Sequence, residues 1–254
     1  LYMVRCMNIE TVSIIMPAYN AEKTIRNSIL SILKQSYSNF RLYVINDSST
    51  DLTENIVKSI NDERIVYLVN DCGKGVSSAR NVGIAASCGK FIAFCDSDDI
   101  WFEKKLEEQL KYLNDGYAVV CSNYEVININ NNNLTERKMA KLITYKNMLH
   151  SNCIGNLTGI YNASIIGKVY QKDIGHEDYL MWLTIVKKTN LVYCVQKNLA
   201  RYTVSETGLS SNKAIAALWQ WNIYRNELGF SMFKSLTLFI IYAFKAFSKR
   251  FYLN

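Results

Sequence analysis

The segment IAFCDSDDIW, residues 92–101, joins an apolar run to a cluster of carboxylates. The run from Phe91 to Cys95 has the composition of a buried strand. Asp96, Asp98 and Asp99 follow it directly. Like charges crowded at the end of a buried strand repel one another and resist dehydration. We therefore expect this strand to end at a site that supplies the acids with a partner.

Strands and helices alternate over the residues that precede this segment. The pattern predicts strands at 12–20, 40–49, 64–71 and 90–96, with helices at 21–36, 49–61 and 75–89 between them. Such alternation over short loops indicates an α/β fold with a mostly parallel, doubly wound (Rossmann-like) sheet flanked by helices. Ligands of such sheets bind beyond the carboxyl ends of the strands. The side chains expected at these ends are Asn20, Asp47, Asn70 and Asp96.

The second half of the chain is less regular. It predicts an amphipathic helix at 101–113, a strand at 117–127, a polar loop or hairpin tip at 128–138, a strand and turn at 155–166, and a helix at 175–188. No Gly/Ser linker and no internal repeat divides the chain. We expect one catalytic domain over residues 1–212, followed by a helical appendage over residues 213–254.

Composition limits the classes of protein to consider. With 254 residues, 49% hydrophobic and 20% charged, the chain is globular. Its seven cysteines are an odd number without a CxxC pair, which argues against a disulfide framework or a zinc site and indicates a reducing compartment. No long apolar segment typical of a signal peptide is visible near the N-terminus. We expect a cytoplasmic protein.

The three acids after residue 95 have two interpretations. They could cap a helix beginning at Trp101, because acids favour helix starts. Three acids exceed what a cap requires, however, and a hard divalent cation such as Mg²⁺ or Mn²⁺ would relieve their repulsion. The cation would take oxygen ligands from one or two carboxylates and the rest from phosphates.

Five motifs carry a resemblance to a known family. VSIIMPAYN, VINDSSTD, GVSSARNVGI, FCDSDD and HEDYLMWL occur in this order, and together they resemble the family 2 glycosyltransferases with the GT-A fold. The similarity runs from about residue 11 to about residue 211. The later segments RYTVSETGLSSNK and QWNIYR resemble bacterial enzymes that extend lipid-linked O-antigen, capsule or similar surface glycans.

The resemblance implies a nucleotide site at the first two strand ends. The first nucleotide-binding loop of the family matches Pro17, Ala18, Tyr19 and Asn20. Tyr19 would offer its ring to a uracil, or it is only a loop aromatic. Asp47 matches the acid that accepts a hydrogen bond from the base. The family usually has a second acid just before it, where this chain has Asn46; an amide can still hydrogen-bond.

Two arginines and one histidine each have two interpretations. Arg80 matches a basic residue at the nucleotide site, or it extends from a helix face into solvent. Arg201 and the GLSS loop at 208–211 match a segment that closes over the donor diphosphate; the other interpretation is an exposed arginine at a strand end. His176 could bind a metal or hydrogen-bond to its neighbours.

The acids receive metal and catalytic roles from the resemblance. Asp98 would be the direct metal ligand, and Asp96 would contact either the ribose or, through a water molecule, the metal. Asp99 would support them or cap the helix. In the family's ED motif the aspartate is the usual general base, which is Asp178 here, and Glu177 would orient donor or acceptor hydroxyls. Acids that only complement a helix N-terminus are the alternative.

The implied function is inverting transfer of a sugar from a nucleotide sugar, UDP-hexose or UDP-N-acetylhexosamine, to a glycan hydroxyl. The implied acceptor is linked to a polyprenyl diphosphate, and the implied cofactor is Mn²⁺ or Mg²⁺. Two other classes are a nucleotidyltransferase that makes nucleotide sugars and a membrane-attached carbohydrate-binding protein with an inactive site. A nucleotidyltransferase would need a Gly-rich basic signature after the first strand, which PAYNAEKT lacks.

The C-terminal residues predict a membrane contact. From Arg201 onward seven Lys or Arg face Glu206 and Glu227, a balance of +5, which favours an acidic surface such as nucleic acid or anionic lipid. One stripe of a helix over 230–252 would hold five apolar residues, Phe233, Ile240, Phe244, Phe247 and Phe251. The longest apolar run is too short to cross a bilayer, so an interfacial helix on the inner face of the cytoplasmic membrane fits better. Packing on the core or on a second subunit is the alternative, and no motif for nucleic acid is visible.

Overall fold

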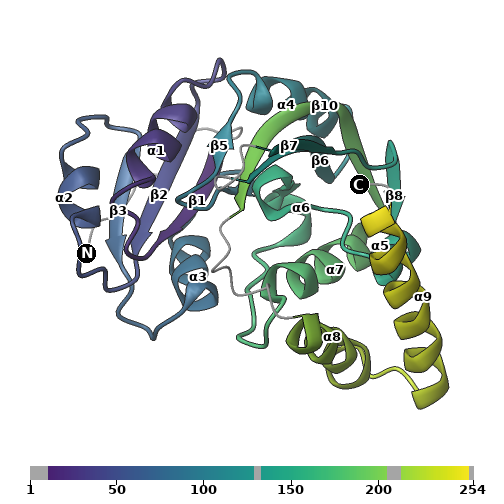
Figure 1. Cartoon of the computed structure of the whole chain (residues 1–254). Coiled ribbons are helices and arrows are strands. Elements are labelled where there is room, and N and C mark those ends of the chain that lie inside the picture. Colours follow the sequence, from purple (N-terminus) through teal and green to yellow (C-terminus); the bar gives the residue numbers. More distant parts are fainter. Residues whose placement is uncertain (1–10, 129–132, 205–212, 252–254) are drawn as a thin grey trace.

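The computed structural model describes residues 11–128, 133–204 and 213–251, with backbone only for residues 213 and 246–251. A single mixed sheet of ten strands runs through these residues, in the order β3-β2-β1-β4-β9-β6-β10-β5, with β7 on β6 and β8 on β10 (Figure 1). Helices cover both of its faces. The tip of the polar tract, residues 129–132, lies outside the described residues.

The first half of the sheet is parallel, as the sequence predicts. Its strands are β1 (Val12–Ala18), β2 (Phe40–Asn46), β3 (Ile65–Val69) and β4 (Phe91–Phe94). The connecting helices are α1 (Ile25–Leu33), α2 (Thr53–Lys58) and α3 (Val76–Ala86). Strand β1 pairs with β2 on one side and β4 on the other, so the carboxyl ends of all four strands meet at one edge.

Helix α3 approaches the sheet closely because its residues are small. A Cβ atom on Gly83 would lie 2.7 Å from Cδ1 of Ile45 and 2.8 Å from Cγ2 of Ile15. The helix therefore rests at Gly83 directly on the side chains of Ile15 in β1 and Ile45 in β2. This close packing fixes the side of α3 that faces the strand ends.

The second half of the sheet is mixed rather than parallel. Its strands are β5 (Ile100–Trp101), β6 (Val119–Asn128), β7 (Asn133–Arg137), β8 (Leu142–Thr144), β9 (Ile160–Asn162) and β10 (Leu191–Val204). Strand β9 is antiparallel to both β4 and β6, whereas β10 is parallel to β6. Parallel neighbours need long crossover connections; α7 lies in the connection that leads into β10.

The remaining helices complete the two layers. They are α4 (Lys105–Asn114), α5 (Tyr145–His150), α6 (Ala163–Ile166), α7 (Glu177–Thr189), α8 (Lys213–Asn222) and α9 (Met232–Phe251), with a 3₁₀ turn η1 (Asn156–Thr158) and a π turn η2 (Ile223–Glu227). The sequence-based start of a helix at residue 101 is wrong. Residues 100 and 101 pair with β10, and the helix begins at Lys105.

The single proline of the chain marks where β1 and β4 separate. The carbonyls of Thr11 and Ile15 accept hydrogen bonds from Phe91 and Cys95 of the β4 side, so odd-numbered residues of β1 face β4. Pro17 is the next odd position, and the β1–β4 pairing has ended at Ile15. A residue without an N–H group costs no ladder hydrogen bond there. The sheet opens between these strands beside the acids.

The C-terminal segment lies against the rest of the protein at the end of the sheet that carries α5 and α7 (Figure 1). Ile223, Tyr224 and Leu238 are buried in the same apolar cluster as α7, and the Tyr224 hydroxyl donates a hydrogen bond to the Leu149 carbonyl at 2.5 Å. Within the described ranges, no helix is long and apolar enough to cross a membrane.

A fully buried lysine begins α4. The ammonium group of Lys105 donates to Oε1 of Gln109 at 2.6 Å and lies 3.9 Å from the centre of the Trp101 ring. Gln109 in turn donates to the Thr158 carbonyl. Burial lowers the pKa of Lys105 from 10.5 to about 7. The charged form is therefore costly in the folded state.

Replacing this lysine should remove a pH dependence of stability. The unfolded chain keeps the Lys105 proton up to about pH 10, while the folded protein releases it near pH 7, so the lysine destabilises most at low pH and less as the pH rises. The gain in unfolding free energy from Lys105→Met should therefore shrink by roughly 2 kcal/mol between about pH 6 and about pH 9. Denaturant unfolding at both pH values measures it.

The neighbouring Lys104→Met is the matched control, because Lys104 is exposed and its replacement should leave the pH dependence unchanged. Stability curves of Lys105→Met and wild type that run parallel over this range would contradict the assignment.

Candidate active site

The loops after β1 and β2 are tied together by side chains. Pro17 and Ala18 end β1, and Asn20 follows with a left-handed φ of 46°. The Asn20 backbone N–H donates to Oγ of Ser49, and its Oδ1 accepts from the N–H of Thr50. The Tyr19 ring between them is 62% exposed. This loop therefore presents a fixed backbone and an open aromatic face.

Asp47 holds the next two loops. It is buried, its Oδ1 accepts from the Asn70 amide at 2.6 Å, and its Oδ2 accepts from the Gly75 N–H at 2.9 Å. Each carboxylate oxygen can accept a further hydrogen bond, so this arrangement is compatible with a nucleotide base. Asn46, at the place of the family's second acid, donates to the Tyr67 hydroxyl and accepts from the Ser49 N–H.

Arg80 of α3 is the centre of the site. Its guanidinium is 5% exposed and forms ion pairs with Asp96 at 2.7 Å and with Glu177 at 3.5 Å. Oε1 of Gln171 accepts a further hydrogen bond at 3.2 Å. The interpretation of Arg80 as an arginine extending into solvent is therefore wrong: it points inward because two carboxylates converge on it.

The three acids after β4 have different surroundings. Asp96 is half-buried on Arg80, Asp98 is exposed, and Asp99 is buried with its Oδ1 accepting from the Thr203 N–H at 3.2 Å. The idea that Asp99 caps a helix is wrong, because a strand follows it and Thr203 of β10 holds its carboxyl group. The pKa of Asp98 rises to about 6, through the loss of hydration among crowded protein atoms and through repulsion by Asp96.

The first turn of α7 brings Glu177 and Asp178 to the same place. Burial raises the pKa of Asp178, while nearby Arg80 lowers it. His176 precedes them at the N-cap with a left-handed φ of 53°, and its ring packs edge-to-face on Trp219. The structure thus gathers Asp96, Arg80, Glu177 and Asp178 from segments that lie far apart in the sequence.

Arg201 lies at the border of this group. Its backbone pairs with Ile100, next to the acids, but its guanidinium binds Glu125 at 2.8 Å and faces the ring of Phe102. The GLSS loop at 208–211 lies outside the described residues. The structure therefore brings Arg201 near the acidic loop without joining it to the Arg80 cluster.

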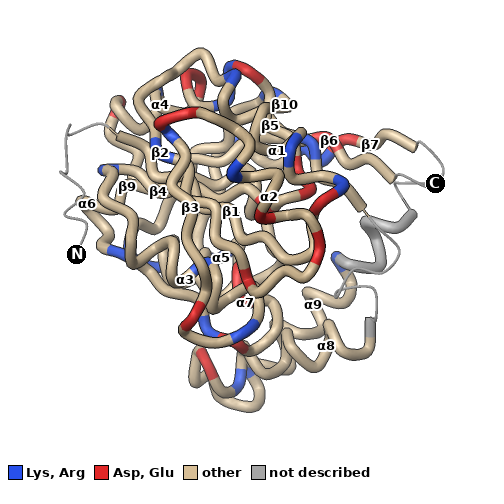
Figure 2. The backbone as a smooth tube through the Cα atoms, turned by 90° about the vertical axis from the view of Figure 1, so that its left-hand side faces the viewer, with Lys and Arg blue, Asp and Glu red and all other residues tan. Residues whose placement is uncertain are grey.

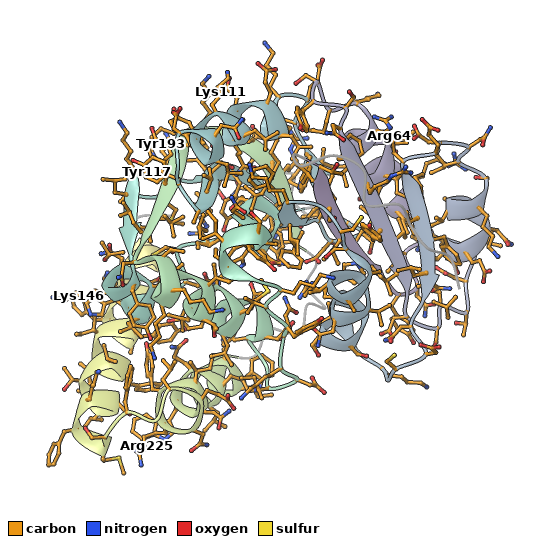
Figure 3. The ribbon with its side chains drawn as sticks, turned by 180° about the vertical axis from the view of Figure 1, so that it is seen from behind. Arg64, Lys111, Tyr117, Lys146, Tyr193 and Arg225 are labelled. Atoms are coloured by element: carbon orange, nitrogen blue, oxygen red, sulfur yellow. The ribbon has the colours of Figure 1, made fainter. Side chains whose placement is uncertain are left out.

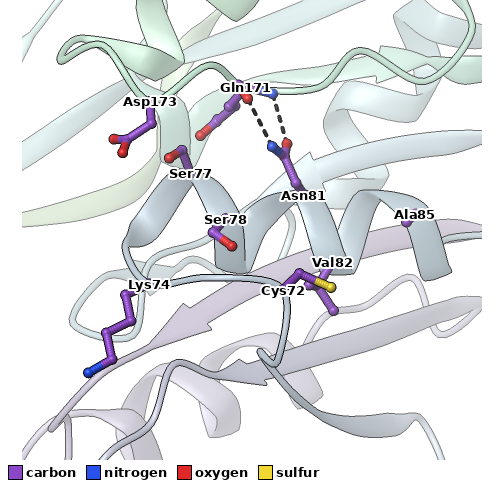
Figure 4. Close-up of a pocket in the computed structure, with 9 residues that line it drawn as sticks. All are labelled: Cys72, Lys74, Ser77, Ser78, Asn81, Val82, Ala85, Gln171 and Asp173. Carbon is purple, nitrogen blue, oxygen red and sulfur yellow. Dashed lines mark hydrogen bonds between the residues drawn. The ribbon is translucent and has the colours of Figure 1, made fainter.

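Three contacts were not expected from the sequence. Asn70 was identified at a strand end but not as the partner of Asp47, and Thr203 and Gln171 were not identified at all. Gln171 exchanges two hydrogen bonds of 2.8 Å with Asn81 of α3, beside a hollow of about 340 Å³ (Figure 4). Thr203 and Gln171 belong to the site only through contacts with residues far away in the sequence, Asp99 and Arg80. No local sequence pattern could therefore have identified them.

The acids suit a hard divalent cation. Asp98 is exposed, and Asp96 uses Oδ1 for Arg80. No group of three His, Cys, Asp or Glu arranged to hold a metal exists within the described parts of the chain. Asp96 and Asp98 could therefore supply two oxygen ligands to Mg²⁺ or Mn²⁺, and water or a phosphate the others.

The mixed sheet with helices on both faces matches the GT-A fold of solved glycosyltransferases. The model of the family described as glycosyl transferase family 2 matches residues 13–170, more than half of the chain. The chain therefore belongs to glycosyl transferase family 2.

Similar proteins agree with this membership. The Escherichia coli UDP-Glc:alpha-D-GlcNAc-diphosphoundecaprenol beta-1,3-glucosyltransferase WfgD is 40% identical over 216 residues, which cover 84% of each chain. Residues 1–349 of S. aureus TarS in complex with UDP-GlcNAc superpose with a TM-score of 0.72 at 20% identity, over 94% of this chain and 73% of that one. The Pyrobaculum calidifontis mannosyltransferase PcManGT, with GDP-Man and Mn²⁺, gives 0.65 at 15% identity over 89% and 66%. These two structures agree in fold.

Removing one acid should stabilise the metal-free protein. The pKa of Asp98 is higher in the folded protein than in the unfolded chain, so its ionisation costs stability above about pH 6 and costs nothing below about pH 4, where both states are protonated. Asp98→Asn should raise the unfolding free energy by roughly 1 kcal/mol near pH 7.5, less than the full shift implies because the side chain is exposed. Denaturant unfolding near both pH values tests this.

The control is Asp115→Asn, an exposed acid after α4 whose replacement should change stability by less than about 0.5 kcal/mol. Mn²⁺ with UDP should raise the melting temperature of wild type and of the Asp115 variant, but not of Asp98→Asn. A variant of Asp98 that responds to Mn²⁺ and UDP like wild type would remove this residue from the metal site.

Proposed function

We propose that the protein is an inverting glycosyltransferase that moves a hexose or N-acetylhexosamine from a UDP-sugar to a hydroxyl of a polyprenyl-diphosphate-linked glycan. One observation carries the proposal: buried Arg80 pairs with Asp96 on the nucleotide side and with Glu177 beside Asp178. The proposed metal-binding acid Asp96 and the pair Glu177–Asp178 thereby share one site. A protein that only binds sugar does not need an arginine that links these two groups of acids.

The donor would lie across the open edge of the sheet. Exposed Tyr19 suits stacking on a base, and Asp47 suits a hydrogen bond to it. The name of WfgD states UDP-Glc as its donor, which supports a UDP-sugar here. Arg201, held by Glu125 beside the acidic loop, would approach the diphosphate from β10.

Mn²⁺ or Mg²⁺ held by Asp98 and Asp96 would neutralise negative charge on the leaving diphosphate. Arg80 is proposed to hold the Asp96 carboxylate in place through its buried ion pair. PcManGT is a neighbour described with Mn²⁺, which supports a divalent cation.

Asp178 is proposed as the general base. The acceptor oxygen would attack the anomeric carbon from the face opposite the diphosphate, its proton would pass to Asp178, and the nucleoside diphosphate would leave with the electrons of the broken bond. A carboxylate of raised pKa is a stronger base than an ordinary one, and burial raises the pKa of Asp178. Glu177, held on Arg80, would orient a sugar hydroxyl.

The proposed lipid-linked acceptor and the exposed side of α9 both suggest that the protein works at a membrane surface. Helix α9 buries Ser235 and Leu238 on one side. The opposite side presents an outer stripe of exposed apolar residues, Phe233, Leu236, Ile240 and Phe244. The side chains of Phe247 and Phe251 lie outside the described residues. We propose that the outer stripe enters the cytoplasmic leaflet, so that residues 1–212 act as the catalytic domain and residues 213–254 as the attachment segment.

Charge near α9 supports an anionic lipid as its partner. Lys146 on α5 and Arg225 before α9 both lie at this end of the molecule (Figure 3), and Lys245 and Lys146 contribute to lowering the pKa of His150 after its burial. On the side of the molecule seen in Figure 2, Lys and Arg residues alternate along the backbone with Asp and Glu residues. The name of WfgD states a diphosphoundecaprenol acceptor, which a membrane-bound enzyme would reach.

Removing the base should separate turnover from binding. Asp178→Asn should lower kcat by roughly 10²–10⁴, the usual worth of a positioned base, while UDP affinity with Mn²⁺ stays nearly unchanged. Transfer from a panel of UDP-sugars to a membrane acceptor fraction, together with calorimetric UDP binding, measures both.

Asp173→Asn, an exposed acid five residues earlier, is the control and should keep wild-type turnover. If Asp178→Asn retained most of its turnover, another group would be the base. A wild-type chain that binds sugar but transfers none would favour the carbohydrate-binding alternative.

The outer stripe should control membrane binding. Phe233→Ser with Phe244→Ser removes two side chains that are 85% and 71% exposed, so the fold should be kept. Wild type should sediment with anionic liposomes at low salt and partly leave them at high salt, because each nearby basic residue contributes about 1 kcal/mol that salt screens. The double variant should stay in the supernatant.

Ile165→Ser on α6 is the control, since Ile165 is 65% exposed but lies on another helix, and it should sediment like wild type. If wild type also stayed in the supernatant at low salt, the stripe would instead be a subunit contact, which the mass in solution would reveal.

A further inference from the structure

The chain enters α7 through two consecutive left-handed residues. Gly175 has a φ of 71° and His176 a φ of 53°. A residue other than glycine is strained in this region, and it keeps that conformation only when its surroundings hold it. The two acids of the proposed site follow immediately. What holds this turn therefore also holds Glu177 and Asp178.

Trp219 of α8 lies directly on the turn. A Cβ atom on Gly175 would be 2.3 Å from both Cδ2 and Cε2 of the Trp219 ring, so only a glycine fits beneath it. The His176 ring meets the same indole edge-to-face, with 5.3 Å between ring centres. Among the described residues, Nε2 of His176 is buried without a hydrogen-bond partner. Ring packing rather than hydrogen bonding by this nitrogen thus holds the imidazole.

The turn sets the position of the first turn of α7. The His176 carbonyl accepts from the N–H of Leu180 at 3.1 Å, and Glu177 reaches Arg80 at 3.5 Å. A displacement of the turn would carry Asp178 with it. Shifts of about 1 Å in reacting groups can lower a rate by roughly 10²-fold.

We infer that Trp219 is a positioning residue: it holds Gly175 and His176 so that the carboxylate of Asp178 faces the acceptor. This rests on the proposed function, in which Asp178 is the base. Trp219 acts through the turn alone. The appendage that carries it is accordingly required for turnover as well as for attachment.

The same helix supplies a matched comparison. Trp221, two residues on, packs edge-to-face on Phe239 of α9 with 5.7 Å between ring centres. It joins α8 to α9, whereas Trp219 joins α8 to α7. Losing either indole leaves a similar gap, so a general loss of packing should affect both variants alike.

The test uses the full chain with Trp219→Ala, Trp219→Phe and Trp221→Ala. Trp219→Ala should lower kcat by roughly 10- to 100-fold while UDP affinity with Mn²⁺ stays within about twofold, because the nucleotide loops lie elsewhere. Trp219→Phe should restore most of the lost turnover, since a phenyl ring still covers the turn. Trp221→Ala should keep kcat near wild type. Gly175→Ala should reproduce the Trp219→Ala defect from the other side of the contact.

Hydrogen exchange gives a second measurement that does not depend on activity. The amide of Leu180 should lose protection in Trp219→Ala and keep it in Trp221→Ala. Unchanged kcat and protection in Trp219→Ala, or equal losses in Trp221→Ala, would overturn the inference. If wild type transfers no sugar, the proposed function fails. The exchange of Leu180 then still decides whether Trp219 holds the turn.

Discussion

The structure of the site depends on one buried cation. The side chain of Arg80 extends from α3, a helix of mostly small residues, to the carboxyl edge of the sheet. There it binds Asp96 and Glu177. Without it, acids from two halves of the chain would repel one another in a partly dehydrated space. With it, the end of β4 and the start of α7 are fixed relative to each other. The close packing of Gly83 on β1 and β2 sets the distance of α3, and so of Arg80, from the sheet.

The local sequence pattern was sufficient to predict the first, parallel half of the sheet. β-branched runs predict β1 to β4, and because parallel strands end at one edge, Asp47, Asn70 and Asp96 were expected together there, as the structure confirms. The antiparallel pairing of β5 was not foreseen, because β5 is only two residues long and is defined by its partner in β10. The same cause explains Asp99: only the contact with Thr203, 104 residues away, separates a held carboxylate from a helix cap.

The C-terminal helix shows a different limit of sequence reasoning. Helix α9 is apolar on two opposite sides, with Leu238 in the core and Phe244 in solvent. The helical periodicity of the sequence can identify apolar sides of α9. It cannot show which side packs on the protein, because that depends on where α5 lies. In the structure, the side of α9 that carries Leu238 is buried, and the outer stripe is exposed to solvent.

Backbone strain is distributed unevenly over the molecule. Among the residues that the structure describes, four other than glycine have left-handed φ values. Three of them, Asn20, Ser48 and His176, follow β1, follow β2 and precede α7. The fourth, Asn190, ends α7 as a C-cap, where glycine is the commonest residue. Selection for heat tolerance alone would accept glycine at position 190 at no functional cost. At the other three positions the same change would relieve strain but free the loops, so a lineage adapted only to heat would drift toward a stable, slow catalyst.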